Sequence, residues 1–600
     1  MKSEHFTNRR FIKGIAKGLK AADPSNYVGP IYTQPNGVYW SNILGRHVGC
    51  VINDLDLYGI PNFNGTVTQC FTQNEAQTAI NNAAASGTAG DVIEIDPSIV
   101  LGTTGGNQSA LRLPVRNVST GYIQIRPLLA NYNALPAYTS GNSPSFWGSS
   151  SQIKPSDSAN LIKLEQRHVN TSVMAFAKGT SGWWLSGFEA YPGATTPTNS
   201  GNLVWCEGCD PGIGPNQTLI SDQPDRIIFD RWYAHNRAVS PINVRRAFIA
   251  NGKNLAFLHC YIENMFWLGQ DSQAIISYNC EGPLAVLGSF LEGMAENFFI
   301  GGADPAISGV NPSDIHFQYN TVYKRPEWNN QSGCKNQLEA KKGKRVCFAN
   351  NKLDGNYHQG QFFAITLKAT NQNGGDPTAR LEDVTTWGNV LINNYTGFYT
   401  PAGNSETPVS AKMARIECAH NLQYKVPGAF GDVGCPPDRN SLRLIGFFND
   451  SHVGGGGYPD IYTHHNSISC IQSLANDLVA IADWPYTANW VNFAFKSNVT
   501  DAASLFGPVY ASNVGANLAA LGIIGDWEYA TNGGPNTGAQ YAAALLASPH
   551  NNKAIVPASI FVDPYTDLRL VDGSPLKLAG YDGLDIGANV ELVLSHLYGI

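Results

Sequence analysis

Residues 257–264 read FLHCYIEN, and this eight-residue design returns along the middle of the chain. Six segments align without gaps: FDRWYAHN from Phe229, FLHCYIEN from Phe257, VLGSFLEG from Val286, FQYNTVYK from Phe317, FANNKLDG from Phe348 and TWGNVLIN from Thr386. They begin about 30 residues apart, which is too close for a strand–helix–strand unit with a full helix but fits one coil of a solenoid. The repeat therefore predicts a stack of similar coils.

Two positions of the repeat indicate what the coils bury. The sixth position is always apolar, and it is occupied by Ala234, Ile262, Leu291, Val322, Leu353 and Leu391. The fourth becomes asparagine in the last three segments, at Asn320, Asn351 and Asn389. In a parallel β-helix, equivalent residues of successive coils stack about 4.8 Å apart. We therefore expect an apolar interior and a ladder of asparagine side chains at one turn, in an all-β, right-handed parallel β-helix solenoid.

The composition agrees with a large folded body. Of 600 residues, 43% are hydrophobic and 14% are charged, which excludes a disordered chain. Sixty-one glycines and 34 prolines favour many short strands joined by turns. The net charge is −7 and the basic clusters are short, so we expect no nucleic-acid partner. No apolar run approaches the ~18 residues that span a bilayer, so we expect no membrane span.

The ends of the solenoid predict three regions. Residues 72–95 indicate a short amphipathic helix, a turn and a first strand, which would form an N-terminal cap. Residues 567–591 are rich in turns and are expected to close the other end, and residues 517–530 and 539–547 are expected to be helical. We expect an N-terminal extension at 1–68, the β-helix at 69–450, and a C-terminal region at 451–600 with a small α-containing part.

The first residues contain a basic amphipathic segment. Lys13, Lys17 and Lys20 interrupt the apolar region that a signal peptide needs. Phe11, Ile12, Ile15 and Leu19 would form one face of a short helix suited to docking on a partner. We expect this segment to stay on the chain, and an export signal is the alternative.

The eleven cysteines leave the redox compartment open. Cys206 and Cys209 are spaced as half of a zinc site without a second half nearby, so a loop or local disulfide is the preferred interpretation. Cys334 and Cys347 bracket a basic loop and are candidates for a bridge.

Candidate catalytic residues lie in the second strand that follows each repeat segment. These strands begin at Asp271, Glu296 and Lys335, so the three residues are expected in one column on successive coils. One coil of separation approximates the ~5–5.5 Å between the carboxyl groups of retaining glycosidases, and two coils approach the inverting range. Stacked carboxylates raise each other's pKa, which suits a general acid. Lysine beside them would also suit β-elimination.

Substrate-binding candidates flank the same coils. Glu263 and Glu292 fall in another column, and Trp267 and Trp328 could offer faces to sugar rings. The alternative is that the tryptophans pack and that the carboxylates cap turns or pair with Lys335 and its basic neighbours. Calcium is possible if Asp271, Glu296 and carbonyl oxygens converge, but we predict no cofactor and no metal ligand. The adjacent residues His464 and His465 are a weak metal signal, because neighbours on a strand face opposite ways.

Several segments resemble a group of bacterial right-handed parallel β-helix proteins of the pectin-lyase-like superfamily. The resemblance rests on GQDSQAIISYN (269–279), ENFFIGGADP (296–305), PSDIHFQYN (312–320), LRLVDGSP (568–575) and DGLDIGA (582–588). It covers about residues 70–400 and 560–592 and departs over the first 70. It implies the fold, and carbohydrate chemistry less directly, since fold does not fix function.

Three functions fit these features. The first is a phage tailspike: a homotrimer in the virion that binds host surface polysaccharide, with or without cleaving it, and whose N-terminal region is attached to tail proteins. The second is an extracellular bacterial polysaccharide lyase or hydrolase. The third is a non-catalytic carbohydrate-binding adhesin or structural virion protein.

Overall fold

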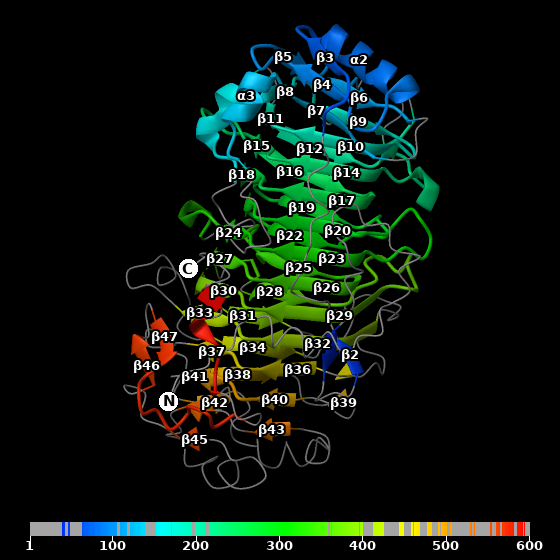
Figure 1. Cartoon of the computed structure of the whole chain (residues 1–600). Coiled ribbons are helices and arrows are strands. Elements are labelled where there is room, and N and C mark those ends of the chain that lie inside the picture. Colours follow the sequence, from blue (N-terminus) through cyan, green and yellow to red (C-terminus); the bar gives the residue numbers. More distant parts are fainter. Residues whose placement is uncertain are drawn as a thin grey trace.

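The fold is known from a computed structural model of the 600-residue chain (Figure 1). It describes residues 63–399 except 105–107, 117–120, 138–151, 170, 195–198, 211–214, 330, 358–359, 362 and 395. It also describes 39–41, 46–48, 412–424, 443–448, 458–459, 461–468, 477–482, 490–491, 494–500, 504–506, 528–530, 533–534, 553–554, 560–563, 567–580, 585–591 and 593–594.

Two long parallel sheets run the length of the described β-helix and a third begins at residue 199, after which each full coil adds one strand to each sheet. The first sheet consists of β3 (Val67–Cys70), β4 (Val92–Ile95), β7 (Ile123–Pro127), β10 (Ser181–Ser186), β14 (Asp225–Asp230), β17 (Lys253–Leu258), β20 (Leu284–Leu287), β23 (Ser313–Gln318), β26 (Gly343–Ala349), β29 (Arg380–Trp387), β32 (Lys412–Ala419), β36 (Ile461–His464), β40 (Ala494–Lys496) and β43 (Glu528–Ala530).

The second sheet follows the first after a short bend. It consists of β5 (Val100–Gly102), β8 (Ile162–Gln166), β11 (Phe188–Pro192), β15 (Tyr233–His235), β18 (Tyr261–Met265), β21 (Phe290–Gly293), β24 (Thr321–Tyr323), β27 (Lys352–Asn356), β30 (Val390–Asn394), β33 (Leu422–Tyr424), β37 (Ser467–Ile468), β41 (Val499–Thr500), β44 (Gly533–Gly534) and β45 (Lys553–Ala554).

The third sheet completes each coil. It consists of β12 (Asn199–Cys206), β16 (Asn243–Ala250), β19 (Gln273–Ser277), β22 (Glu296–Ile300), β25 (Leu338–Ala340), β28 (Phe363–Leu367), β31 (Thr396–Tyr399), β34 (Arg443–Phe448), β38 (Asp477–Ala482) and β42 (Ser504–Phe506). This arrangement is a parallel β-helix, so the predicted fold class is confirmed.

Smaller elements surround these sheets. They are the parallel sheet β6 (Leu111–Leu113), β9 (Met174–Ala177) and β13 (Gly208–Cys209), the parallel pair β35 (Tyr458–Pro459) and β39 (Trp490–Val491), the antiparallel pairs β1 (Tyr39–Ser41) with β2 (Arg46–Val48) and β46 (Phe561–Asp563) with β47 (Asp567–Leu570), the helices α2 (Gln73–Ser86) and α3 (Leu129–Ala134), and the 3₁₀ turns η2 (Pro155–Asn160), η3 (Ile220–Asp222) and η4 (Pro326–Trp328).

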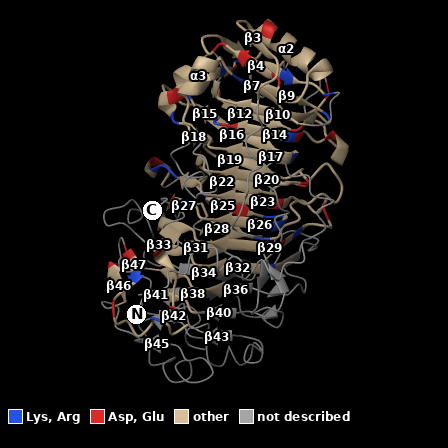
Figure 2. Cartoon of the chain, in the orientation of Figure 1, with Lys and Arg blue, Asp and Glu red and all other residues tan. Residues whose placement is uncertain are grey.

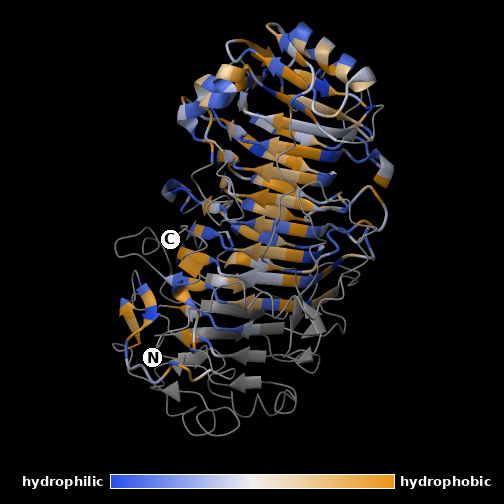
Figure 3. Ribbon diagram, viewed as in Figure 1, coloured by the Kyte–Doolittle hydropathy of each residue, from blue (hydrophilic) through white to orange (hydrophobic). Residues whose placement is uncertain are grey.

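The repeat alignment is confirmed residue by residue. Its first positions pair between neighbouring strands of the first sheet, from Phe229 with Phe257 to Phe348 with Thr386. The sixth positions pair in the second sheet, where Ile262, Leu291, Val322 and Leu353 stand on consecutive coils. These side chains are fully buried in one continuous core, and hydrophobic residues run along the middle of the strands (Figure 3).

The bend between the first and second sheets explains the asparagines. Its first residue, which is the third position of the repeat, has a left-handed backbone: φ is 54° at His259 and 55° at Asn350. The asparagine that follows continues a buried ladder. Asn351 Nδ2 donates to Asn389 Oδ1 at 2.9 Å, and its own Oδ1 accepts from Nδ2 of Asn320 at 3.1 Å. The ladder extends beyond the predicted residues through Asn421, Asn466 and Asn498.

The N-terminal cap is confirmed. Thr72 caps α2, because its hydroxyl oxygen accepts the backbone N–H of Glu75 at 3.2 Å. Gln73 exchanges two hydrogen bonds with Gly102, the last residue of β5, and Gln77 exchanges two with Arg112 of β6. The helix therefore pairs main-chain groups of the first coil that would otherwise be an open sheet edge.

The described part of the C-terminal segment is rich in turns and packs along the side of the solenoid. Its apolar side chains, among them Phe561, Leu568 and Leu576, pack against Val390 and Leu422 on the outside of the second sheet. The red elements of Figure 1 accordingly lie beside β30 and β33. The apolar outer face of the second sheet thus holds the described part of this segment along the side of the stack, and its closing role stays a prediction.

Strands continue past residue 450, as β36, β40 and β43 of the first sheet show. Residues 528–530 form β43, so the end of the helix predicted at 517–530 is wrong, whereas its remaining residues and 539–547 lie outside the described chain. Described residues 590, 591, 593 and 594 are helical. The division into three regions stays a prediction.

Other predictions have mixed outcomes. Strand β2 lies against β29 and β32 of the first sheet, and the helix predicted near Phe11 lies outside the described residues. Cys206, Cys209 and Cys334 are free and buried, so neither the local Cys206–Cys209 disulfide nor the Cys334–Cys347 bridge is present. Among the described helices, none combines the length and apolarity needed to cross a bilayer.

Candidate functional site

Asp271, Glu296 and Lys335 lie together at the edge where the third sheet begins. The Lys335 ammonium is 2.6 Å from Asp271 Oδ1 and 4.0 Å from Glu296 Oε1. The Asp271 side chain is 45% exposed and that of Glu296 is 2% exposed. Lys335 thus joins a carboxylate at the surface to one that is buried beside it.

The sequence predicted that these three residues stack in one column, and the register of the strands shows that they do not. Glu296 stands opposite Gln273, not Asp271. Lys335 precedes β25, in which Leu338 pairs with Phe298, so it too is displaced from the Glu296 position. The connections from the second to the third sheet differ in length from coil to coil, so a fixed offset from the repeat fails there. Side-chain reach, and not strand pairing, brings the three residues together.

Glu296 has an environment that favours its neutral form. Burial is the main cause, and the nearby carboxylates of Glu339 and Asp271 add to it, while Lys335 and a hydrogen bond from Gln273 act in the opposite direction. The result is a pKa raised to about 8. Gln273 Nε2 donates to Glu296 Oε2 at 2.7 Å and is itself held by Arg246 Nε at 2.8 Å. Glu296 is therefore an acid that keeps its proton near neutral pH.

Lys324 holds the turn that leads to Glu296. Its buried ammonium donates to the carbonyl oxygens of Gly293, Met294 and Ala295 at 2.8–2.9 Å. Burial lowers the pKa of Lys324 to about 8. Sequence reasoning missed this residue, although it occupies the eighth position of the segment that starts at Phe317, where the other segments carry no lysine.

Glu263 and Glu292 share one cation on the outside of the second sheet. Arg325 Nε binds Glu292 Oε2 at 2.7 Å, and Nη2 of the same guanidinium lies 3.4 Å from Glu263 Oε2. Burial raises the pKa of Glu292 despite this partner. The charged pairing that we gave as the alternative interpretation is therefore present for both residues.

The aromatic surface differs from the prediction. Trp328 is 5% exposed and packs against Met294 and Tyr357, so its ring is not a surface for sugars and that assignment is wrong. Trp267 is partly exposed. Tyr261 and Phe290, which the sequence analysis did not select, stack with ring centroids 4.4 Å apart and are partly exposed. The sequence pattern that could have indicated this pair is the fifth position of the repeat, which is aromatic in three consecutive segments.

The arrangement can supply a proton, a second carboxylate and a fixed positive charge at one place. Lys335 already occupies the space between Asp271 and Glu296, where a calcium ion bound by both would lie. Acidic and basic residues are interspersed along the described coils in Figure 2.

Comparison with known proteins gives a likeness in fold. No family model and no curated protein matches the chain. It is similar to a mannuronic acid specific polysaccharide family 6 lyase enzyme from human gut microbiota, with 10% identity and a TM-score of 0.38, over 82% of this chain and 91% of that one. It is also similar to an alginate lyase from Paenibacillus sp. str. FPU-7, with 10% identity and a TM-score of 0.32, over 67% and 98%. Likeness at this level does not bear on chemistry.

Proposed function

We propose that this β-helix binds a polysaccharide along the corner between its second and third sheets and hydrolyses it there. The observation that supports the proposal is Glu296, a buried carboxyl group with a pKa of about 8 next to the half-exposed Asp271. Glu296 would donate a proton to the departing glycosidic oxygen, and Asp271 would act on the sugar from the surface.

Lys335 would control access to the acid. Its ammonium bridges Asp271 and Glu296 in the free protein. An anionic group of the polysaccharide would compete for this ammonium, releasing Asp271 and opening a path to Glu296. Neighbouring sugar units would be held by the stacked rings of Tyr261 and Phe290 and by the Arg325 guanidinium. The two rings lie on β18 and β21 of the same coils, and Arg325 lies in the connection that follows β24.

The test is a panel of acidic and neutral bacterial surface polysaccharides incubated with the full chain. We expect new reducing ends from at least one glycan, without the unsaturated product that elimination would give. Glu296→Gln should lower the rate by about 100-fold or more because the proton donor is lost, while glycan binding persists. The exposed Glu281→Gln serves as the matched control.

Three outcomes would change the assignment. Full activity of Glu296→Gln would exclude it as the acid. An unsaturated product would show that the protein is a lyase. This is the alternative enzyme class, since a lysine next to the carboxylates also suits β-elimination. Binding without cleavage by the wild type would show a carbohydrate-binding adhesin.

We propose a phage tailspike as the setting, with an extracellular bacterial enzyme as the alternative. The support is the basic amphipathic segment from Phe11 to Leu19, which is suited to docking on tail proteins. In that setting the chain would be a homotrimer carried in the virion.

A further inference from the structure

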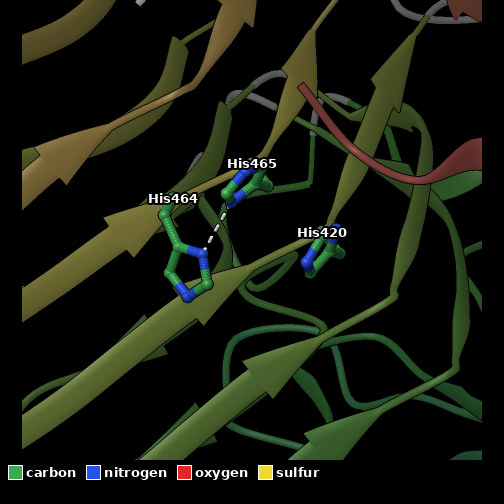
Figure 4. Close-up of side chains that lie close together, drawn as sticks. All are labelled: His420, His464 and His465. Atoms are coloured by element: carbon green, nitrogen blue, oxygen red, sulfur yellow. Dashed lines mark hydrogen bonds between the residues drawn. The ribbon is translucent and has the colours of Figure 1, made fainter. Parts of the chain in front are cut away.

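Three histidines gather where the first sheet bends into the second on two consecutive coils (Figure 4). His420 follows β32, His464 ends β36, and His465 comes next. One ring nitrogen of each lies within 4.8 Å of those of the other two. The group is several coils away from Glu296, so it is not part of the site described above.

The bend explains why neighbouring residues in the sequence meet. His465 has a left-handed backbone with φ of 49°, as His420 does with 54°. The chain therefore turns between His464 and His465, and the expectation that their side chains face opposite ways is wrong. The rings of His420 and His465 stack with centroids 5.1 Å apart. The asparagine ladder fixes both bends, since Asn421 N donates to Asn466 Oδ1 at 2.9 Å.

A buried carboxylate orients one of the rings. Glu417 Oε1 lies 2.8 Å from Nε2 of His464, and in the tautomer that donates Nε2–H to this oxygen, Nδ1 of His464 keeps its lone pair. That Nδ1 lies 2.9 Å from Nδ1 of His465, so a proton or a cation must stand between the two nitrogens. Glu417 Oε2 is buried and accepts no hydrogen bond from the described residues. Carboxylate, histidine and metal in this order are a common arrangement around protein metal sites.

We propose that His420, His464 and His465 bind one transition-metal ion of the zinc, nickel or copper type. Imidazole nitrogens suit these ions, and the three ligands include no oxygen atom that would favour calcium or magnesium. Nitrogens on one tetrahedral zinc ion lie about 3.3 Å apart, from Zn–N bonds of about 2.0–2.1 Å. The 4.8 Å limit in the structure means that small ring rotations would close the site.

His420 is the ring best placed to move. Its Nδ1 accepts the backbone N–H of Asn589 at 3.3 Å, at the long end for a hydrogen bond, so this bond is the weaker of those that a metal ion would replace. Three protein ligands leave a position open for water or an outside ligand. Binding would replace the contact between Nδ1 of His464 and Nδ1 of His465 by bonds from both nitrogens to the ion.

The test uses the full chain freed of metal with a chelator. Equilibrium dialysis against Zn²⁺ followed by elemental analysis should give one ion per chain, and Co²⁺ should give the visible absorption of a nitrogen-bound ion. His420→Asn and His465→Asn remove a ligand but retain a residue that tolerates the left-handed backbone. Each should abolish stoichiometric binding with little change in melting temperature.

Two further variants define the site. Glu417→Gln should weaken zinc binding by about 10-fold, because the carboxylate that orients His464 is lost. The exposed His168→Ala should bind as the wild type does. Equal zinc content in the wild type and in folded His420→Asn and His465→Asn, or no stoichiometric binding by the wild type, would overturn the proposal.

Discussion

Glu296 combines burial, two neighbouring carboxylates and one lysine, and these features make it responsive to pH. Its pKa is raised from an ordinary value of 4.5 to about 8 in the folded chain. At a pH between these two values, Glu296 keeps its proton in the folded protein and releases it in the unfolded chain. The contribution of Glu296 to stability is therefore complete below pH 4.5 and is lost as the pH rises through about 8.

The first prediction follows from this sign. Urea unfolding of the wild type should show stability falling between about pH 5 and pH 9, and Glu296→Gln should flatten that part of the profile because glutamine cannot ionise. Glu281→Gln, an exposed change, should leave the profile as it is. An equally steep fall in Glu296→Gln would mean that other groups cause it.

The second prediction concerns Arg325, which pairs with the buried Glu292 and the exposed Glu327. Arg325→Ala should destabilise the protein by about 2 kcal/mol at neutral pH, since Glu292 is left buried without its cation. The loss should shrink in acid as Glu292 takes up a proton. Glu327→Gln should cost less than about 0.5 kcal/mol. A cost of Arg325→Ala independent of pH would contradict the pairing with Glu292.

At the scale of elements, the asparagine ladder determines how one coil joins the next. The Asn351 side chain makes hydrogen bonds to Asn320, Phe317 and Asn389, and all of them are buried. Each such group left without a partner costs about 1–3 kcal/mol. The ladder is therefore expected to be among the most sensitive features of the fold.

The third prediction is that Asn351→Ala lowers the free energy of unfolding by about 3 kcal/mol or more. Asn373→Ala, on an exposed loop, should change it by less than about 0.5 kcal/mol. Denaturant unfolding followed by circular dichroism would measure both. Similar small effects of the two substitutions would show that the ladder is not a source of stability.

The repeat could be predicted from the sequence because the first bend keeps a constant length on every coil compared. The sixth-position residues, such as Ile262 and Leu291, therefore stack as the alignment indicated. Asp271 and Glu296 could not be placed in register, because the connection before the third sheet varies in length. The burial of Trp328 and the meeting of His464 with His465 depend on tertiary packing and a left-handed residue, which no local pattern reveals.

At the scale of the molecule, the N-terminal extension and the assembly state carry the tailspike proposal. Residues 67–70 form β3 of the first sheet, and β2 lies against β29 and β32. A deletion that tests attachment should therefore stop before β1 and remove residues 1–38, leaving these contacts in place.

The fourth prediction is that the full chain sediments as a homotrimer, and that the chain lacking residues 1–38 keeps its fold and glycan binding but no longer enters phage particles. Analytical ultracentrifugation and incorporation assays would measure the two properties. A monomer with an N-terminus cleaved near Ala22 would favour the exported bacterial enzyme.

The most direct measurement is the pH–rate profile of glycan cleavage, recorded together with the ionisation of Glu296 by infrared difference spectroscopy against Glu296→Gln. We expect the carboxyl signal to titrate near pH 8, cleavage by the wild type to decline over the same interval, and Glu296→Gln to be inactive while still binding glycan. Titration of Glu296 near its ordinary value, with cleavage intact in Glu296→Gln, would contradict the assignment of this residue as the acid.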